Sequence, residues 1–222
     1  MPVTVAIIGA GPLGRWLALA AARAGFRVLL EDVMPANLHH AQEFLRQQLG
    51  PQQTVDTLPA LKGHGFSRAA NNAIKSRALA PEGCFSDGSP ITFVSTIEEA
   101  VRHADLVIDC VPDELESKLE ILWLLDRMAP PRTVLATPTT RLSITDLASC
   151  TYRPAKCIAI AAEAKTLTGN PQAGTGNAPA ASPEIQLRTT TQTAPETVAL
   201  LDRFWRQLGF TPIFQPDPAH EP

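Results

Sequence analysis

The stretch "VTVAIIGAGPLG" at residues 3–14 decides the fold class, because it joins a β-branched apolar run to a glycine-rich turn. Residues 3–9 predict a buried strand, and a helical pattern follows the turn from Pro12 to Ala24. A second short apolar run, "RVLLE" at 27–31, comes next. Strand, helix and strand in this order predict a βαβ unit, which belongs in a parallel sheet.

The rest of the chain continues the alternation of strands and helices. Apolar runs predict strands at 91–95, 105–111, 133–137, 156–161, 184–190 and 211–214. Helices are predicted at 35–49, after the Thr96-x-x-Glu99 capping box, at 113–128, after Ser143, and at 195–208. We expect residues 1–222 to form a single α/β domain with a doubly wound, mostly parallel sheet of about eight strands of the Rossmann type. Two segments break the pattern, an irregular excursion at 50–90 and a Gly/Pro/Ala-rich loop at 169–183.

The composition excludes several classes of protein. The chain has 222 residues, 45% of them hydrophobic and 18% charged, with a formal charge of -3. Lys and Arg are scattered among Asp and Glu, so no basic face for nucleic acid is expected. The apolar runs are shorter than the ~20 residues that cross a bilayer, and no basic leader precedes the first run. We therefore expect a cytoplasmic protein that does not bind membranes. The four cysteines form no C-x-x-C pair, which predicts reduced thiols and no metal site.

The motif "GAGPLG" at 9–14 has the spacing G-x-G-x-x-G and lies between a predicted strand and a predicted helix. Gly9 would allow the tight turn, Gly11 the approach of a pyrophosphate, and Gly14 the packing of helix on strand. Pro12 suits the first helical turn, and the amides around Leu13 would face the phosphates. The motif predicts a dinucleotide site; the alternative is a glycine turn that only joins strand to helix.

An acidic residue follows the second predicted strand, as such a site requires. Asp32 comes 18 residues after Gly14, where a carboxylate accepts hydrogen bonds from an adenosine ribose. Glu31 precedes it, and the following "VMPAN" has no Arg to receive a 2′-phosphate. The sequence therefore predicts NAD as the cofactor in preference to NADP. The alternative for Asp32 is a surface carboxylate beside a helix.

Several strings along the chain resemble the N-terminal NAD-binding domain of the 3-hydroxyacyl-CoA dehydrogenases. They are "VAIIGAGPLGRWLALAAARAGFRVLLED" at 5–32, "ADLVIDCVPDELESKLEIL" at 104–122, "LATPTTRLSITDLA" at 135–148 and "RPAKCIAI" at 153–160. The resemblance implies an oxidoreductase fold, NAD(H) as cofactor, an acyl-CoA or other small-molecule substrate, and a place in fatty acid metabolism.

The resemblance also implies where the nicotinamide end of the cofactor lies. In such enzymes the segment matching Val111 to Lys118 lies beside the nicotinamide ribose, with an acid at the position of Asp113. Val111, Pro112, Lys118 and, on the next strand, Thr137 are therefore expected to contact the cofactor. For Lys118 a second interpretation stays open, a solvated lysine on an amphipathic helix.

The same resemblance predicts that the catalytic pair of the family is missing. Its histidine, which takes the hydroxyl proton, corresponds to Ala161, and the glutamate that orients it corresponds to Gln186. The helical second domain that completes the family's substrate pocket is also expected to be absent, since the chain ends at Pro222. Loss of general acid–base assistance removes ~10²–10⁴ in rate, so the protein is expected to bind NAD(H) but to be weakly active or inactive by itself.

A rival hypothesis is an active NAD-dependent oxidoreductase on a hydroxyacyl or other hydroxy or keto substrate. Its catalytic group would be Lys165, or Thr140 at the place of the family's serine, and a partner chain would complete the site. The five histidines are expected in solvated or helix-end positions. The first hypothesis instead makes the protein a sensor or a partner subunit, and a homo-oligomer is compatible with both.

Overall fold

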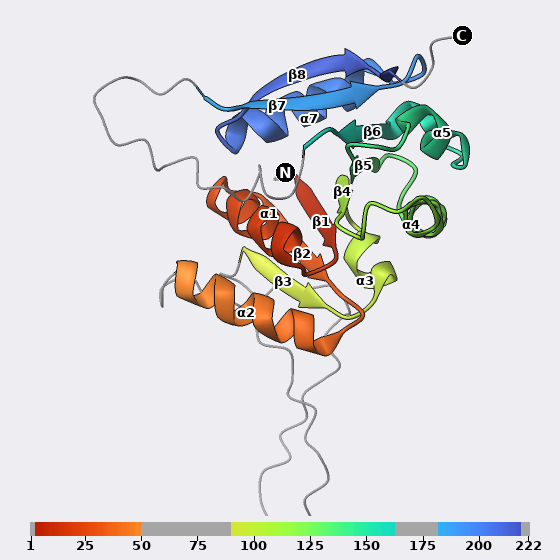
Figure 1. Cartoon of the computed structure of the whole chain (residues 1–222). Coiled ribbons are helices and arrows are strands. Elements are labelled where there is room, and N and C mark those ends of the chain that lie inside the picture. Colours follow the sequence, from red (N-terminus) through yellow and green to blue (C-terminus); the bar gives the residue numbers. More distant parts are fainter. Residues whose placement is uncertain (1–2, 50–89, 163–181, 219–222) are drawn as a thin grey trace, which may run out of the picture.

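The computed structural model describes residues 3–49, 90–162 and 182–218, so the predicted irregular segments, 50–90 and 169–183, lie outside the described residues apart from their ends. One sheet of eight strands has the order β3-β2-β1-β4-β5-β6-β7-β8 (Figure 1). Neighbouring strands are parallel except β6 and β7, which are antiparallel. The strands are β1 (Thr4–Ile8), β2 (Arg27–Glu31), β3 (Ile91–Val94), β4 (Leu106–Asp109), β5 (Val134–Pro138), β6 (Cys157–Ile160), β7 (Glu184–Thr189) and β8 (Thr211–Pro216). The predicted doubly wound, mostly parallel sheet is confirmed.

Strand β1 lies where the strand order reverses. From β1 the chain first extends the sheet through β2 to β3 and then crosses to β4 on the other side. In open α/β sheets, ligands bind outside the carboxyl ends of the strands at such a switch point. The topology therefore places a candidate site over the carboxyl ends of β1, β2 and β4.

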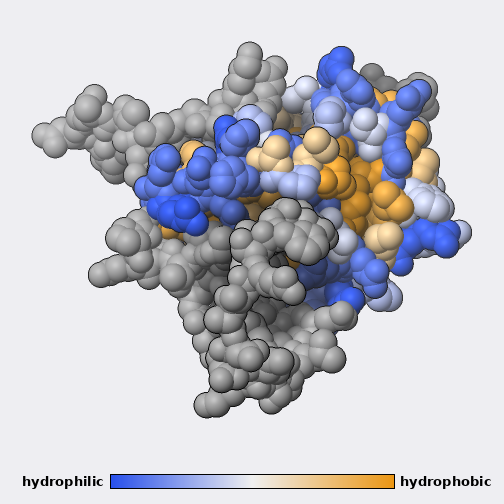
Figure 2. All heavy atoms as spheres, turned by 90° about the horizontal axis from the view of Figure 1, so that it is seen from below, coloured by the Kyte–Doolittle hydropathy of each residue, from blue (hydrophilic) through white to orange (hydrophobic). Residues whose placement is uncertain are grey.

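Helices cover both faces of the sheet, each over its own apolar core (Figure 1). One face carries α1 (Pro12–Arg23), α2 (Pro35–Leu49) and α7 (Pro195–Gln207). The other face carries α3 (Ile97–Val101), α4 (Leu115–Met128) and α5 (Ile144–Ser149), and the 3-10 turn η1 (Pro154–Lys156) leads into β6. Viewed from below, α2 presents a hydrophilic surface, whereas hydrophobic residues reach the surface on the side of α3 and α4 (Figure 2). Among the described helices, none combines the length and the apolarity needed to cross a membrane.

Local signals in the sequence explain where these helices begin. The Thr96 hydroxyl accepts a hydrogen bond from the Glu99 amide at 3.3 Å, and the Ser143 hydroxyl caps α5 in the same way. Pro12 occupies the first turn of α1, where its missing N–H costs no hydrogen bond. The predicted elements agree with the observed ones within a residue or two at most ends. The last strand runs two residues beyond the predicted Phe214, because its pairing with β7 continues to Pro216.

Candidate functional site

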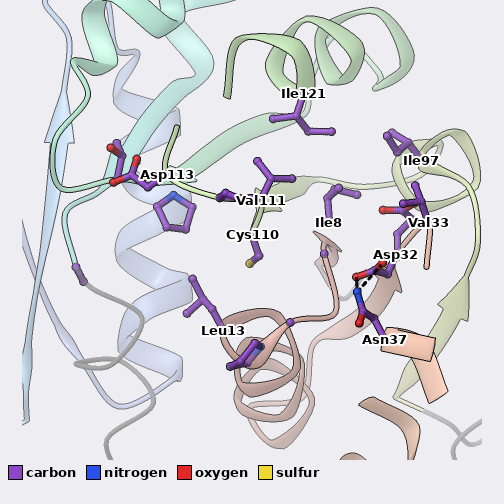
Figure 3. A pocket seen from close by; sticks show the side chains of 18 of the residues that line it. Ile8, Leu13, Asp32, Val33, Asn37, Ile97, Cys110, Val111, Asp113 and Ile121 are labelled. Atoms are coloured by element: carbon purple, nitrogen blue, oxygen red, sulfur yellow. Dashed lines mark hydrogen bonds between the residues drawn. The ribbon is translucent and has the colours of Figure 1, made fainter. Parts of the chain in front are cut away.

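A cavity of about 670 Å³ opens at the switch point, beside the carboxyl ends of the central strands (Figure 3). Asp32, Val33, Asn37 and Ile97 lie toward one end of the cavity and Asp113 toward the other. The residues that line it come from six parts of the chain: Ile8, Gly9, Gly11, Pro12 and Leu13; Glu31, Asp32, Val33 and Asn37; Ile97; Cys110, Val111, Pro112, Asp113 and Ile121; Pro138, Thr139 and Thr140; and Ala162.

The three glycines of the turn each have a separate structural reason. Gly9 has a φ of +101°, which L side chains rarely adopt. At Gly14 a Cβ atom would lie 1.8 Å from the carbonyl oxygen of Gly9, so no side chain fits between α1 and the turn. At Gly11 a Cβ atom would meet no atom within 4 Å, because this backbone faces the open cavity. No side chain caps α1, so amides of its first turn are available to phosphate oxygens. The residues present therefore fit a dinucleotide pyrophosphate.

Asp32 lies in the cavity wall with its carboxylate held in place by protein donors. Its Oδ2 accepts a hydrogen bond from the Ala10 amide at 2.8 Å, and its Oδ1 accepts one from the Met34 amide at 2.8 Å. The Asn37 side-chain amide lies 3.1 Å from both oxygens. Asp32 is only 8% exposed, so the interpretation as a surface carboxylate is wrong. These donors fix the orientation of the carboxylate.

Glu31 is a second carboxyl in the same wall, and its surroundings are different. The residue is 2% exposed, and its Oε1 has no hydrogen-bond partner among the described residues. Burial, reinforced by the charge of Asp32, raises the pKa of Glu31 to about 7. The sequence indicated two neighbouring carboxyls here but not that both are buried. A signal was present, because Glu31 shares a face with Leu29, two residues earlier in the strand.

Lys118 forms a buried ion pair that the sequence did not predict. Its Nζ lies 2.5 Å from Oδ1 of Asp109, and both side chains are fully buried. Burial raises the pKa of Asp109, and the ammonium of Lys118 opposes this effect. The interpretation of Lys118 as a solvated lysine is therefore wrong. Lys118, Thr137 and Gly14 were all predicted at the cofactor site, yet none of the three lines the cavity. Their predicted roles stay predictions.

The opposite end of the cavity is formed by the segments that follow β4 and β5. The Thr140 amide donates to Oδ2 of Asp113 at 3.2 Å, which joins these two segments. Thr139 turns back into its own loop, where its hydroxyl accepts a hydrogen bond from the Leu142 amide at 3.0 Å. Thr140, the predicted substrate-contacting hydroxyl, does line the cavity, as do Val111 and Pro112.

The two positions matched to the family's catalytic pair lie side by side across β6 and β7. The Ala161 amide donates to the carbonyl oxygen of Gln186 at 2.8 Å. This adjacency is the one that a histidine and its orienting acid would need, and neither residue can transfer a proton. None of the histidines in the described ranges lines the cavity, and Lys165 lies outside the described residues.

Other kinds of site receive no support from the part of the chain that the structure describes. Within it, no group of three or more His, Cys, Asp or Glu side chains is placed to hold a metal ion. A second, smaller hollow of about 270 Å³ is lined mainly by short side chains, Ala148, Ser149 and Thr190 among them. The cavity at the switch point is thus the best-supported candidate site.

Comparison with known families gives a direct match. Residues 4–161 match the family model described as "3-hydroxyacyl-CoA dehydrogenase, NAD binding domain". The matched range begins with β1 and ends just after β6, so it includes the glycine turn and every strand that borders the cavity.

Individual relatives agree with that match. A "Probable 3-hydroxybutyryl-CoA dehydrogenase" of Bacillus subtilis is 32% identical over 154 residues, which cover 69% of this chain and 46% of that protein. A "5-formyl-3-hydroxy-2-methylpyridine 4-carboxylate 5-dehydrogenase" of Mesorhizobium japonicum is 28% identical over 94% of this chain and 56% of its own. A crystal structure of a dehydrogenase acting on the same pyridine compound, an NAD+ dependent dismutase, superposes with a TM-score of 0.66 at 26% identity, covering 98% of this chain and 59% of that one. The chain spans about half the length of these relatives.

Proposed function

The chain belongs to the 3-hydroxyacyl-CoA dehydrogenase family by its NAD-binding domain, and from this premise we propose that it holds NAD(H) in the switch-point cavity but contributes little acid–base catalysis of its own. The observation that carries the binding half is the glycine turn, where Gly9 has a positive φ and Gly14 leaves no room for a side chain while Gly11 opens onto the cavity. Bound NAD supplies the hydride-accepting or hydride-donating ring. The protein residues bind and orient it.

We assign the end of the cavity at Asp32 to the adenosine of NAD and the end at Asp113 to its nicotinamide. Asp32 is placed to accept hydrogen bonds from the adenosine ribose, while Val33 and Ile97 offer apolar walls to the adenine. The amides of the first turn of α1 lie where they can donate to the pyrophosphate. Asp113 and Thr140 then border the nicotinamide end. This assignment is supported by the order of the residues along the cavity (Figure 3).

The catalytic half of the proposal depends on the nicotinamide end. Oxidation of a hydroxyl group by NAD moves a hydride from the carbon that bears the hydroxyl and needs a base within hydrogen-bonding reach to take the hydroxyl proton. The adjacent residues Ala161 and Gln186 carry no such base. Thr140 has a hydroxyl but no basic partner among the described residues. We therefore expect a protein that binds the cofactor and is slow or inactive by itself, acting as a sensor or as one subunit of a larger assembly.

A specific observation favours the rival function, an active oxidoreductase. The loop at the nicotinamide end is braced on two sides, since Arg188 donates to the Thr140 carbonyl at 2.8 Å and Arg141 donates to the Asp113 carbonyl at 2.8 Å. Such bracing positions a loop that still contacts substrate. In this case Lys165 or a partner chain would supply the base. The names of the relatives support hydroxyacyl-CoA or small hydroxy and keto compounds as its substrates in that case. Fatty acid metabolism and a cytoplasmic location stay part of the proposal.

Calorimetric titration tests the binding half. NADH is expected to bind more tightly than NADPH, because the Asp32 carboxylate would repel a 2′-phosphate. Among the described residues that line the cavity there is no Lys or Arg to receive that phosphate. Equal affinities, or a preference for NADPH, would contradict the role given to Asp32.

A further inference from the structure

We propose that NAD binds only when Glu31 carries a proton, so that binding of the cofactor takes up one proton from solution. This inference rests on the proposed NAD site and adds a residue and a proton to it. It concerns the adenosine end of the cavity, away from the nicotinamide end where catalysis would occur.

Two adjacent carboxyls in this wall, Asp32 and Glu31, differ in the hydrogen-bond donors that surround them. Asp32 accepts hydrogen bonds from the amides of Ala10 and Met34 and from the side chain of Asn37. Glu31 has a buried Oε1 to which no described residue donates. When two titratable neighbours have such different environments, their pKa values separate. Glu31, the carboxyl whose buried oxygen has no donor, is the member that keeps a proton.

Among the described residues, no positive charge near Glu31 is free to stabilise its ionised form. In the sheet register, Glu31 pairs with Ile8, and Ile8 pairs on its other side with Asp109, so the two acids lie in one row on the same face. The charge of Asp109 is matched by Lys118, which is bound to it at 2.5 Å. Burial raises the pKa of the neighbouring Cys110 thiol, so this group stays neutral.

Among the described residues, the elements packed beside Glu31 place no cation in this wall either. Strand β3 pairs with Glu31 through Val94, α3 contributes Ile97 to the wall, and α2 contributes the neutral amide of Asn37. The acidic residues of α3, Glu98 and Glu99, are exposed to solvent. Asp32 is thus the charge that acts on Glu31, and it is negative.

Cofactor binding should raise the pKa of Glu31 further. An adenosine over this wall removes the remaining water from Glu31, and desolvation disfavours the charged form of a carboxyl. In the free protein the pKa of Glu31 is about 7, so the neutral, binding-competent form prevails below pH 7 and becomes scarce above it. Because apparent affinity falls in proportion to the competent fraction, NAD should bind about tenfold more weakly at pH 8 than at pH 6.

The test is calorimetric titration of the whole chain with NAD at pH 6 and pH 8, in buffers with different enthalpies of ionisation. We expect an uptake close to one proton per NAD at pH 8 and little at pH 6. Glu31→Gln, which mimics the neutral carboxyl, should bind NAD about tenfold more tightly than the parent at pH 8 and take up no proton. Glu43→Gln, on the exposed side of α2, is the matched control and should behave as the parent does.

Two fragments of the cofactor locate the effect. ADP-ribose should reproduce the proton uptake, because it fills the adenosine end, whereas nicotinamide mononucleotide should show none. Binding of NAD without uptake at pH 8, or with release of a proton, would overturn this proposal and leave the proposed function intact. Failure of NAD to bind at any pH would overturn both.

Discussion

Two buried carboxyls lie at the ends of β2 and β4, on either side of β1, and they differ in whether a cation is bound to them. Asp109 at the end of β4 is matched by the fully buried ammonium of Lys118. Glu31 at the end of β2 is 2% exposed, and no cation among the described residues lies beside it. Only Ile8 separates them in the register. A buried charge with a partner is a fixed part of the structure, while a buried carboxyl without one titrates near neutral pH. The difference separates a structural acid from one that can respond to ligand.

The largest expected effect comes from breaking the pair at β4. Lys118→Met leaves Asp109 buried without its cation, which should lower the free energy of unfolding by about 3–5 kcal/mol in urea denaturation at pH 7. The double variant with Asp109→Asn removes both charges and should recover much of the loss. A Lys118→Met protein as stable as its parent would show that the two side chains do not form a buried pair in solution.

A substitution at the end of β2 is expected to raise the free energy of unfolding, by a smaller amount. Glu31 ionises near pH 4.5 in the unfolded chain and near pH 7 in the folded one, so stability falls as the pH rises between these values. Glu31→Gln should therefore stabilise the protein by up to about 3 kcal/mol at pH 8 and have little effect at pH 4. Denaturation at both pH values measures this difference. If Glu31→Gln destabilised the protein equally at pH 4 and pH 8, the carboxyl would be charged or hydrogen-bonded in the folded state.

The smallest expected effect concerns the acid beside Glu31. Asp32→Ala removes the predicted ribose acceptor and should weaken NADH binding about tenfold, a typical value for a lost hydrogen bond to a charged group. The gap between NADH and NADPH should narrow, because one repulsive charge is gone. Fluorescence titration of NADH provides the measurement, with Asp202→Ala on the exposed side of α7 as control. Unchanged NADH affinity in a folded Asp32→Ala protein would remove this residue from the site.

Much of the fold was predictable because its signals are local. The β-branched runs, the glycine turn and the capping residues Thr96 and Ser143 each determine their own neighbourhood, and the structure confirms them. The position of Asp32 was predictable from its spacing after Gly14, because Asp32 directly follows β2 and this strand ends beside the glycine turn. The hydrogen bond between Ala10 and Asp32 shows the result.

The features that sequence reasoning missed all depend on contacts between distant elements. The amphipathic pattern of α4 fits a solvated or a buried Lys118 equally well, and only the packing of α4 against β4 brings Lys118 to Asp109. Burial of Glu31 depends on α3 and on the strands to either side of β2, none of which adjoins it in sequence. Ile97, which lies far from Glu31 in the sequence, lines the cavity for the same reason. Tertiary packing, which local patterns do not encode, decides these positions.

A steady-state assay tests the central claim most directly. The claim is that the protein binds NAD but lacks a base at the nicotinamide end of the cavity. The protein is saturated with NAD, as verified by titration, and supplied with 3-hydroxybutyryl-CoA while NADH formation is followed by absorbance. We predict bound cofactor and a rate near background, because Ala161 and Gln186 occupy the positions that need a base and its orienting acid. A turnover of ~1 s⁻¹ or more, the low end of ordinary enzymes, would contradict the claim.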